Sequence, residues 1–589
     1  MNNSLFYNIN YYENLLLSYL RTLLKLCHRW FIATFIQTIG ARRLFPCWDD
    51  PQLKTAFTIS IKNNRNLMAL SNMPIRNYDS SQNNFTCIHF HTTPLMSTYQ
   101  VAMVVSNLFP FKINANITVW CRKYLERFLR FKGGIIESIT SYLEFKLNRT
   151  EIPKIDHVVI PNFPHDDVLK LGLIIHRESD FVHNEKLHPV MGNVEITRLI
   201  AFKIAHQWFS NAISPSQWYY FWLHDGLAAL YGEEAIVKSF NNSRLMDLFV
   251  VQNQYESLNL GSHFNLNPPR NNNLSDVNSI LSFPRYIKGL IILRMLQDTV
   301  TDNLFQRSIQ TFLYKYMSTS VTPYKFWSIQ EHLITNYEYF INISNVYQAW
   351  IKNEHYPVIT WKENSYTVSG ALSQIDTFNI VKRKWWICTN LLILPSLTTI
   401  AKIWLTPQES SFELEYTEDD MIIIDIQQAG YYRVKYDTQN WLKIVHYLNS
   451  EKYKDLSVIN RAKIIDDAFY FLVTRQLNIS IFWELTRYLS QEIDYVAWYP
   501  MIKVFEYISN IFPFSQDHTF IDNVKEKLRK LLDLPLKTLG FQENLMEDDL
   551  VKCLRQEIVK WACMLNHSEC ITTATYKLQQ FYKSPSKYE

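Results

Sequence analysis

Residues 201–211 read Ala-Phe-Lys-Ile-Ala-His-Gln-Trp-Phe-Ser-Asn, and residues 222–226 read Trp-Leu-His-Asp-Gly. Apolar residues recur with the spacing of one helical face, at Ile200, Ile204, Trp208 and Ala212. Phe202 and His206 lie four residues apart, so they share a neighbouring face of the same helix. The pattern predicts a helix that presents Phe202 and His206 together, with the carboxylate of Asp225 following later in the chain.

Helical periodicity extends over residues 120–147 and 193–240, and it resumes at about residue 441 and continues to the end of the chain. Strand patterns occupy two other regions, 41–112 and 357–436. The clearest runs of strand-like sequence are 57–61, 101–105, 357–361, 385–388 and 431–436. The order is therefore strands, mixed helices, a small strand region and helices.

Composition sets broad limits on the class of protein. The 589 residues are 47% hydrophobic and 19% charged, which is ordinary for a globular protein of about four domains. A net charge of +4 is small for this length, and no basic stripe interleaved with aromatic residues is found, so we expect no nucleic-acid partner.

The two ends show no targeting segment. Asn2, Asn3 and Glu13 replace the basic start of a signal peptide. The apolar stretch 15–36 contains Arg21, Lys25, His28 and Arg29, so we expect an amphipathic or buried segment and no transmembrane segment. The polar end, 583–589, offers no hydrophobic tail for an anchor.

Cysteines and glycosylation triplets give weaker indications. Cys563 and Cys570 are close enough in sequence to close a small loop, and no CxxC pair indicates a zinc knuckle. Nine N-x-S/T triplets favour a secreted glycoprotein only slightly, because the chain is rich in asparagine. The triplets begin at Asn2, Asn84, Asn116, Asn148, Asn241, Asn273, Asn342, Asn478 and Asn566.

Several blocks of sequence resemble one family. Residues 41–51 read ARRLFPCWDDP, similar to the ARRAFPCFDEP of the aminopeptidase N-like zinc metallopeptidases. The blocks that follow in the family's order are 69–74, 96–99, 430–434 and 460–468. Cys563 and Cys570 match a family disulfide. The chain is therefore identified as a member of this family, with the resemblance running from about Arg29 to Cys570.

The resemblance implies a multidomain α+β architecture. We expect a truncated N-terminal β domain over 1–112, a thermolysin-like α/β domain over 113–356, a small β-sandwich over 357–440 and a partial C-terminal α-helical superhelix over 441–589. Residues 1–28 resemble nothing in the family. Family members are typically at the cell surface, so the resemblance implies an extracellular or cell-surface location.

The zinc site of the family is degenerate here. Active members carry H-E-x-x-H with a distal Glu, and the matching positions are Phe202, Lys203, His206 and Asp225. Phe202 has no lone pair, and a protonated Lys203 cannot act as the general base. His206 and Asp225 are left as vestigial metal positions, so no cofactor is predicted, although the family uses zinc. A rebuilt site that includes His176, His183, His188 or His224 is not expected, because their spacing matches no ligand pattern.

We predict that Lys203 replaces the lost ion and pairs with Asp225. The alternative is that its side chain extends to solvent. For His206, the alternative to a ligand is a packed, hydrogen-bonded histidine.

The family's amine-binding GAMEN motif is also lost. Its Glu and Asn positions are Leu169 and Lys170. A substitute site from His165, Asp166 and Asp167 is possible, although a solvated loop is the simpler interpretation. By resemblance, Tyr286 is the retained oxyanion tyrosine and Gln37 lines the first substrate pocket, although either could be an ordinary structural residue.

These features predict a catalytically inactive pseudo-peptidase that binds peptides or a protein partner. Two alternatives stay open: a zinc-dependent aminopeptidase that releases N-terminal residues from peptides, and a decayed or mis-joined gene product.

Overall fold

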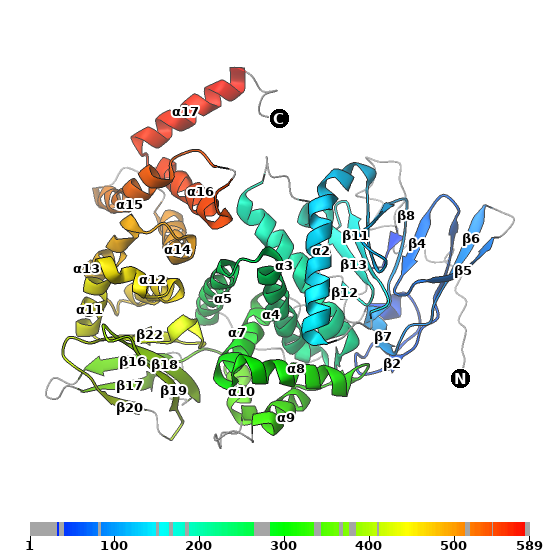
Figure 1. Cartoon of the computed structure of the whole chain (residues 1–589), viewed down its shortest axis with the longest axis horizontal. Coiled ribbons are helices and arrows are strands. Elements are labelled where there is room, and N and C mark those ends of the chain that lie inside the picture. The colour runs from blue at the N-terminus through cyan, green and yellow to red at the C-terminus, as the bar shows by residue number, and fades with distance from the viewer. Residues whose placement is uncertain are drawn as a thin grey trace. The chain divides into compact units, whose positions relative to one another are not determined.

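The computed structural model describes residues 32–34, 40–80, 84–148, 152–163, 169–182, 188–263, 283–334, 343–363, 369–375, 385–408, 411–512, 519–544 and 546–583. The chain divides into two units (Figure 1). Unit 1 comprises residues up to 186 with 194–243 and 267–347, and unit 2 comprises 187–193, 244–266 and 348–589.

The first part of unit 1 consists of short strands in small sheets. One sheet has the order β1 (Ile32–Ala33), β8 (Met103–Ser106), β4 (Met68–Ser71). A second sheet has the order β3 (Ser60–Asn64), β6 (Phe85–Phe90), β5 (Ile75–Ser80). In a third, β2 (Lys54–Thr55) pairs with β7 (Met96–Ser97). The strands predicted at 57–61 and 101–105 begin two or three residues later. The backbone amide of Phe57 donates a hydrogen bond to the Thr93 hydroxyl. The backbone amide of Val101 donates to the carbonyl oxygen of Thr98, which closes a turn.

A five-stranded sheet forms the centre of unit 1. Its order is β12 (Leu169–Lys170), β13 (Leu173–Arg177), β11 (Ile155–Ile160), β10 (Ile117–Cys121), β9 (Phe109–Lys112). β10 and β11 run parallel because α2 (Glu126–Leu147) makes the crossover between them. Every residue of β11 is buried, as expected for a central strand covered on both faces.

Helices complete unit 1. They are most of α3 (Val190–His206), α4 (Phe221–Phe240), α7 (Phe283–Val300), α8 (Asp302–Tyr316), α9 (Pro323–Ile334) and the start of α10 (Ile343–Lys352). The helical region predicted at 193–240 is two helices, because a π-helical turn at Gln207–Ala212 and the strand β14 (Ser214–Pro215) interrupt it. β14 pairs with β15 (Ser320–Val321).

Unit 2 contains α5 (Arg244–His263) and two packed groups of elements. The strand predictions for 357–436 are confirmed by two sheets, β20 (Ser411–Glu415), β17 (Ser369–Ile375), β16 (Val358–Glu363), β22 (Arg433–Lys435), and β19 (Thr398–Leu405), β18 (Ile387–Leu394), β21 (Met421–Ile424). The predicted helical end is confirmed by α11 (Thr438–Leu448), α12 (Val458–Val473), α13 (Ile479–Thr486), α14 (Tyr495–Ile511), α15 (Thr519–Leu539), α16 (Asp549–Met564) and α17 (Ser568–Lys583).

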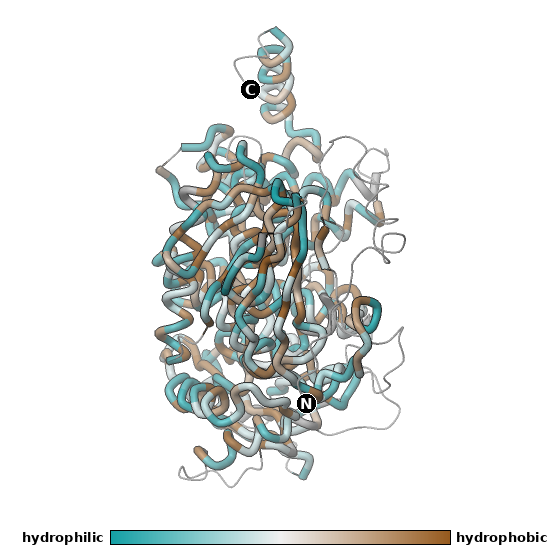
Figure 2. The backbone as a smooth tube through the Cα atoms, turned by 90° about the vertical axis from the view of Figure 1, so that its right-hand side faces the viewer, coloured by the Kyte–Doolittle hydropathy of each residue, from teal (hydrophilic) through white to brown (hydrophobic). Residues whose placement is uncertain are grey.

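The disulfide expected from the family is present between Cys563 and Cys570, and it joins the end of α16 to the start of α17. Beyond this link, α17 carries both hydrophilic and hydrophobic stretches (Figure 2). Leu578 and Tyr582 of this helix are exposed.

A buried ionic network joins β22 to α12 within unit 2. The Arg433 guanidinium lies 3.0 Å from Asp467 and 3.1 Å from Asp466. Lys463 lies 2.9 Å from Asp467 and 3.3 Å from Asp425. All five side chains are buried, so each charge depends on its partners.

The architecture is thus multidomain, with an N-terminal β region, a mixed α/β middle and a helical C-terminal region. The four domain boundaries predicted from the sequence stay predictions. Residues 1–28 lie outside the described structure, as does most of 15–36. Across the helices that the structure describes, none is long and apolar enough to cross a membrane.

Candidate functional site

Two helices of unit 1, α3 and α4, carry the residues singled out in the sequence. The π-helical turn that follows α3 is of a kind found frequently at functional sites. Gly232 of α4 faces the backbone of α3: a Cβ atom at this position would lie 3.1 Å from the carbonyl carbon of Ala201 and 3.1 Å from the amide nitrogen of Phe202. The missing side chain lets α4 approach α3 closely, which brings Asp225 beside His206.

His206 and Asp225 are in contact in the protein interior. The imidazole Nε2 lies 3.1 Å from the Asp225 Oδ1, and the two residues are 0% and 4% exposed. The contact is not aligned as a hydrogen bond, and neither ring nitrogen of His206 has another partner among the described residues. The Phe202 ring packs edge-on against the imidazole at 4.5 Å between centroids. The positions that would bind a metal in the family are therefore in contact with one another.

Lys203 points into the sheet of unit 1. Lys203 is 1% exposed, and its ammonium donates a hydrogen bond of 3.0 Å to the carbonyl oxygen of Ile175. The alternative that Lys203 extends to solvent is therefore wrong, because the side chain is enclosed by α3 and the neighbouring strand. The predicted Lys203–Asp225 pair is not among the described contacts.

Two histidines lie beside Lys203. His157 of β11 and His176 of β13 stack with their Nδ1 and Nε2 atoms 2.9 Å apart. Burial, and after it the Lys203 ammonium, lowers the pKa of His157 to about 3. The same causes lower the pKa of His176. Sequence reasoning missed this pair, and the only signal was a histidine in each of two strongly apolar strands.

Lys170, at the lost Asn position of GAMEN, is also turned inward. Its ammonium donates to the carbonyl oxygen of Tyr99, and the residue is 2% exposed. Burial lowers the pKa of Lys170 to about 7. Gln207 fixes the backbone here, because its amide donates to the Lys170 carbonyl oxygen and accepts from the Gly172 amide. Lys170 therefore contributes to packing in the interior of the unit.

His224 does not join His206 as a second ligand. Its Nδ1 contacts the carbonyl oxygen of Phe209, so this nitrogen carries the proton. Burial lowers the pKa of His224 to about 3.

Several predicted site residues lie outside the described structure. These are Gln37, His165, Asp166, Asp167 and His183. Tyr286 belongs to α7, and Leu169 belongs to β12, but their side chains are not described. The roles predicted for these residues stay predictions.

The residues present do not fit a catalytic zinc ion. Such an ion takes three protein ligands and a water. Here Phe202 offers no donor atom, Lys203 is hydrogen-bonded to Ile175, and His206 and Asp225 contact one another. Within the described part of the chain, no group of three His, Cys, Asp or Glu residues is arranged to hold a metal.

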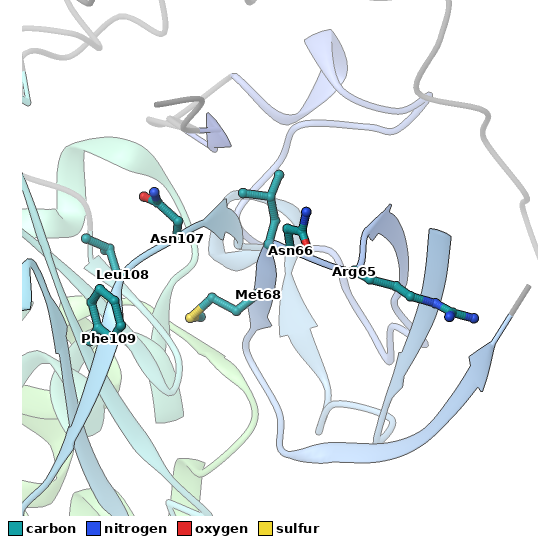
Figure 3. A pocket seen from close by; sticks show the side chains of 7 residues that line it. Arg65, Asn66, Met68, Asn107, Leu108 and Phe109 are labelled. Carbon is teal, nitrogen blue, oxygen red and sulfur yellow. The ribbon is translucent and has the colours of Figure 1, made fainter. Parts of the chain in front are cut away.

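A surface hollow lies elsewhere in unit 1, in the N-terminal β region (Figure 3). Its volume is about 350 Å³, and it opens between the turn before β4 and the loop that joins β8 to β9. The lining residues are Arg65, Asn66, Leu67, Met68, Asn107, Leu108 and Phe109. None of the vestigial zinc positions lines it.

Three family models match the chain in order. Residues 24–100 match the "Peptidase M1 N-terminal domain", 132–350 the "Peptidase family M1 domain" and 421–587 the "ERAP1-like C-terminal domain".

Curated relatives agree with these matches. The chain is 27% identical to "Aminopeptidase N" of Plutella xylostella over 94% of its length and 61% of the relative. It is 26% identical to "Thyrotropin-releasing hormone-degrading ectoenzyme" of Rattus norvegicus, over 92% of the chain and 54% of the relative. It is 25% identical to "Glutamyl aminopeptidase" of Sus scrofa, over 93% of the chain and 59% of the relative.

The chain therefore spans between half and two thirds of the length of these relatives. Three domain models match the chain in order, and relatives named as aminopeptidases align with nearly its whole length. The chain therefore belongs to the M1 peptidase family.

Proposed function

We propose that this chain is a catalytically inactive member of the M1 peptidase family, which binds peptides or a protein partner without zinc. The observation that carries the proposal is the buried 3.1 Å contact between His206 and Asp225, with Phe202 at the first ligand position. Two of the family's three ligand positions contact one another, and the third is a hydrocarbon ring.

The loss of the general base supports the same conclusion. In a zinc peptidase the ion lowers the pKa of its bound water, and a neighbouring carboxylate accepts the proton. Lys203 stands at the carboxylate position and donates to the Ile175 carbonyl oxygen. A buried ammonium in this place cannot accept a proton, and it would oppose a nearby metal cation.

The proposed ligand is a peptide held by contacts other than its free amino group. Leu169 and Lys170 stand where the family binds that group, and Lys170 is directed to Tyr99. Relatives are named as aminopeptidases, so a peptide remains the class of ligand that the family suggests.

We also propose an extracellular or cell-surface location. The Cys563–Cys570 disulfide supports it, because disulfides persist mainly in oxidising compartments. One relative is itself named an ectoenzyme.

Zinc content and peptidase activity test the main proposal. The purified full chain should contain almost no zinc by elemental mass spectrometry, and it should not cleave a chromogenic aminoacyl amide with or without added zinc. One zinc per chain that is lost in His206→Ala but kept in His89→Ala, together with chelator-sensitive turnover, would overturn it and establish a zinc aminopeptidase. His89 is a suitable control because it lies in β6, where it contacts Ser60 and Asp79.

Peptide binding needs its own measurement. A fluorescent peptide and its N-acetylated form should bind with similar affinity, because the amine anchor is lost. A strong preference for the free amine would contradict the proposed mode of binding. A chain that aggregates and never unfolds cooperatively would favour the third interpretation, a decayed gene product.

A further inference from the structure

Four basic side chains lie close together in the interior of unit 1, and we call them the basic cluster. Each comes from a different element: Lys132 from α2, His157 from β11, His176 from β13 and Lys203 from α3. None of the four residues is more than 5% exposed. The two imidazoles stack with 5.1 Å between their centroids, and the Lys203 ammonium donates to a carbonyl oxygen of β13.

Electrostatic effects within the cluster come from its own cations. Burial is the main cause that lowers the pKa of both imidazoles, and the Lys203 ammonium is the next. The Lys132 ammonium lowers the pKa of His176 further. Burial alone lowers the pKa of Lys132, to about 8. Among the described residues, no carboxylate contributes to any of these three shifts, so the cluster lacks a described counter-charge for Lys132.

Three nitrogen atoms of the cluster are buried and have no hydrogen-bond partner among the residues that the structure describes. They are Lys132 Nζ, His157 Nε2 and His176 Nδ1. Buried polar atoms in proteins are nearly always paired with protein, water or an ion. An ammonium group carries three donors, and that of Lys132 uses none of them within the described part of the chain. Described protein atoms therefore leave the hydrogen bonding of the cluster incomplete.

Other buried lysines have acidic partners. Lys463 lies 2.9 Å from Asp467 and 3.3 Å from Asp425. Lys525 lies 3.6 Å from Asp522. Such a partner offsets the free energy that it costs to bury an ammonium. A negative charge beside Lys132 would do the same in the basic cluster, whereas a water molecule would supply hydrogen bonds without charge.

We propose that the basic cluster binds a small monovalent inorganic anion, such as chloride, between the Lys132 ammonium and the His176 imidazole. When His157 Nδ1 donates to His176 Nε2, the proton of the neutral His176 ring lies on Nδ1, which then donates to the anion. A divalent anion is excluded, because the cost of removing water from an ion rises steeply with its charge. The proposal does not depend on the loss of peptidase activity.

Burial indicates the side from which the ion enters. Lys132 is 5% exposed, whereas the other three residues of the cluster are 0–1% exposed. The α2 side of the cluster is therefore the least enclosed, and an ion that enters there meets the Lys132 ammonium first. This degree of enclosure also limits the ligand to one of atomic or near-atomic size.

Thermal unfolding of the full chain tests the proposal. The melting temperature should rise to a plateau as sodium chloride replaces sodium gluconate at constant ionic strength, because a ligand that binds only the folded state stabilises it. Gluconate is too large for the site and should give no such effect. Equal melting temperatures in the two salts would overturn the proposal and indicate a cluster of neutral groups with water.

A pair of lysine variants assigns the effect to the cluster. Lys132→Met should abolish the dependence on chloride, and we expect it to fold, because it removes a buried ammonium that has no described partner. Lys525→Met is the matched control, since Lys525 is 4% exposed but pairs with Asp522 in unit 2. The control should keep the dependence. The same response to chloride in both variants would refute the assignment to Lys132.

Anomalous diffraction locates the ion without any substitution. Crystals of the full chain, grown at a bromide concentration that saturates the effect on melting temperature, should show a bromide peak within hydrogen-bond distance of Lys132 Nζ. Bromide is the probe because it resembles chloride in size and scatters anomalously. Peaks confined to the protein surface would identify an adventitious ion only and would overturn the proposal.

Discussion

His157 Nδ1 lies 2.9 Å from His176 Nε2 in the central sheet of unit 1, with the Lys203 ammonium close enough to lower the pKa of both rings. A stacked pair of this kind shares one hydrogen bond and is stable when both rings are neutral. The pair therefore makes the stability of unit 1 dependent on pH.

Acid should destabilise the protein through this pair. A histidine whose pKa falls to about 3 on folding takes up its proton in the unfolded chain first. Stability is therefore lost as the pH falls below about 6.5, by at most about 1.4 kcal/mol per pH unit for each such histidine. Urea unfolding at pH 7, 6, 5 and 4 measures this loss.

A variant isolates the contribution of the histidines from that of buried carboxylates. Burial raises the pKa of Glu233 and Asp466, and these groups favour the folded state as the pH falls. His157→Phe should give a shallower loss between pH 6.5 and 4 than the unsubstituted chain. Parallel curves for the two proteins would contradict the prediction.

Replacing the Lys203 ammonium should change the histidines and the stability together. Lys203→Met keeps much of the buried chain and removes the charge, so we expect the pKa values of His157 and His176 to rise towards the ordinary value. Lys203→Glu places a carboxylate at the Ile175 carbonyl oxygen, and it should destabilise by about 2–4 kcal/mol more than Lys203→Met. NMR titration of the rings and urea unfolding measure the two effects; unchanged ring pKa values in Lys203→Met would show that the charge has no influence.

The contact between α3 and α4 should tolerate no side chain at Gly232. Gly232→Ala places a Cβ 3.1 Å from the backbone of Ala201 and Phe202, and the strain should cost about 1–3 kcal/mol. Gly134→Ala in α2 is the matched control, because a Cβ there meets no atom within 4 Å. That change should stabilise by about 0.5–1 kcal/mol through helix propensity. Equal melting temperatures for the two variants would refute the close approach.

The buried network of unit 2 should depend on Asp467. This carboxylate pairs with Arg433 and Lys463 and accepts a hydrogen bond from the Val434 backbone amide. Asp467→Ala therefore leaves two buried cations with one partner fewer. We expect a loss of about 3–5 kcal/mol. Glu484→Ala, which disrupts a pair between the exposed side chains of Glu484 and Arg487, should cost less than about 1 kcal/mol. Similar urea midpoints for both variants would contradict the role of burial.

Sequence periodicity predicted most of the elements but few of their ends. The strands of 357–436 and the helices after 441 are where they were expected, because apolar spacing reports which face is buried. The break after His206 was missed, since the apolar spacing of Trp208 and Ala212 continues through the π-helical turn. A spacing rule cannot distinguish a π turn from regular helix over so few residues.

The site was only partly predictable, for a different reason. Motif comparison identified Phe202, Lys203, His206 and Asp225, because the family fixes their positions. It could not give the direction of the Lys203 side chain, which depends on a carbonyl oxygen from a strand 28 residues away in sequence. His157 was missed because it belongs to no recognised block, and Tyr99 was recognised only as part of the family block 96–99, with no role; the fold brings them to Lys203 and Lys170.

The contact between His206 and Asp225 has a consequence for the history of the chain. His206 and Asp225 lie in contact with no ion between them, which predicts that folding of this region does not depend on zinc supply. A single reversion at Phe202 would restore one donor but would leave Lys203 in place of the base. Under the proposed loss of activity, the route back to an active enzyme therefore passes through intermediates that gain no catalytic advantage, so natural selection would rarely reverse it.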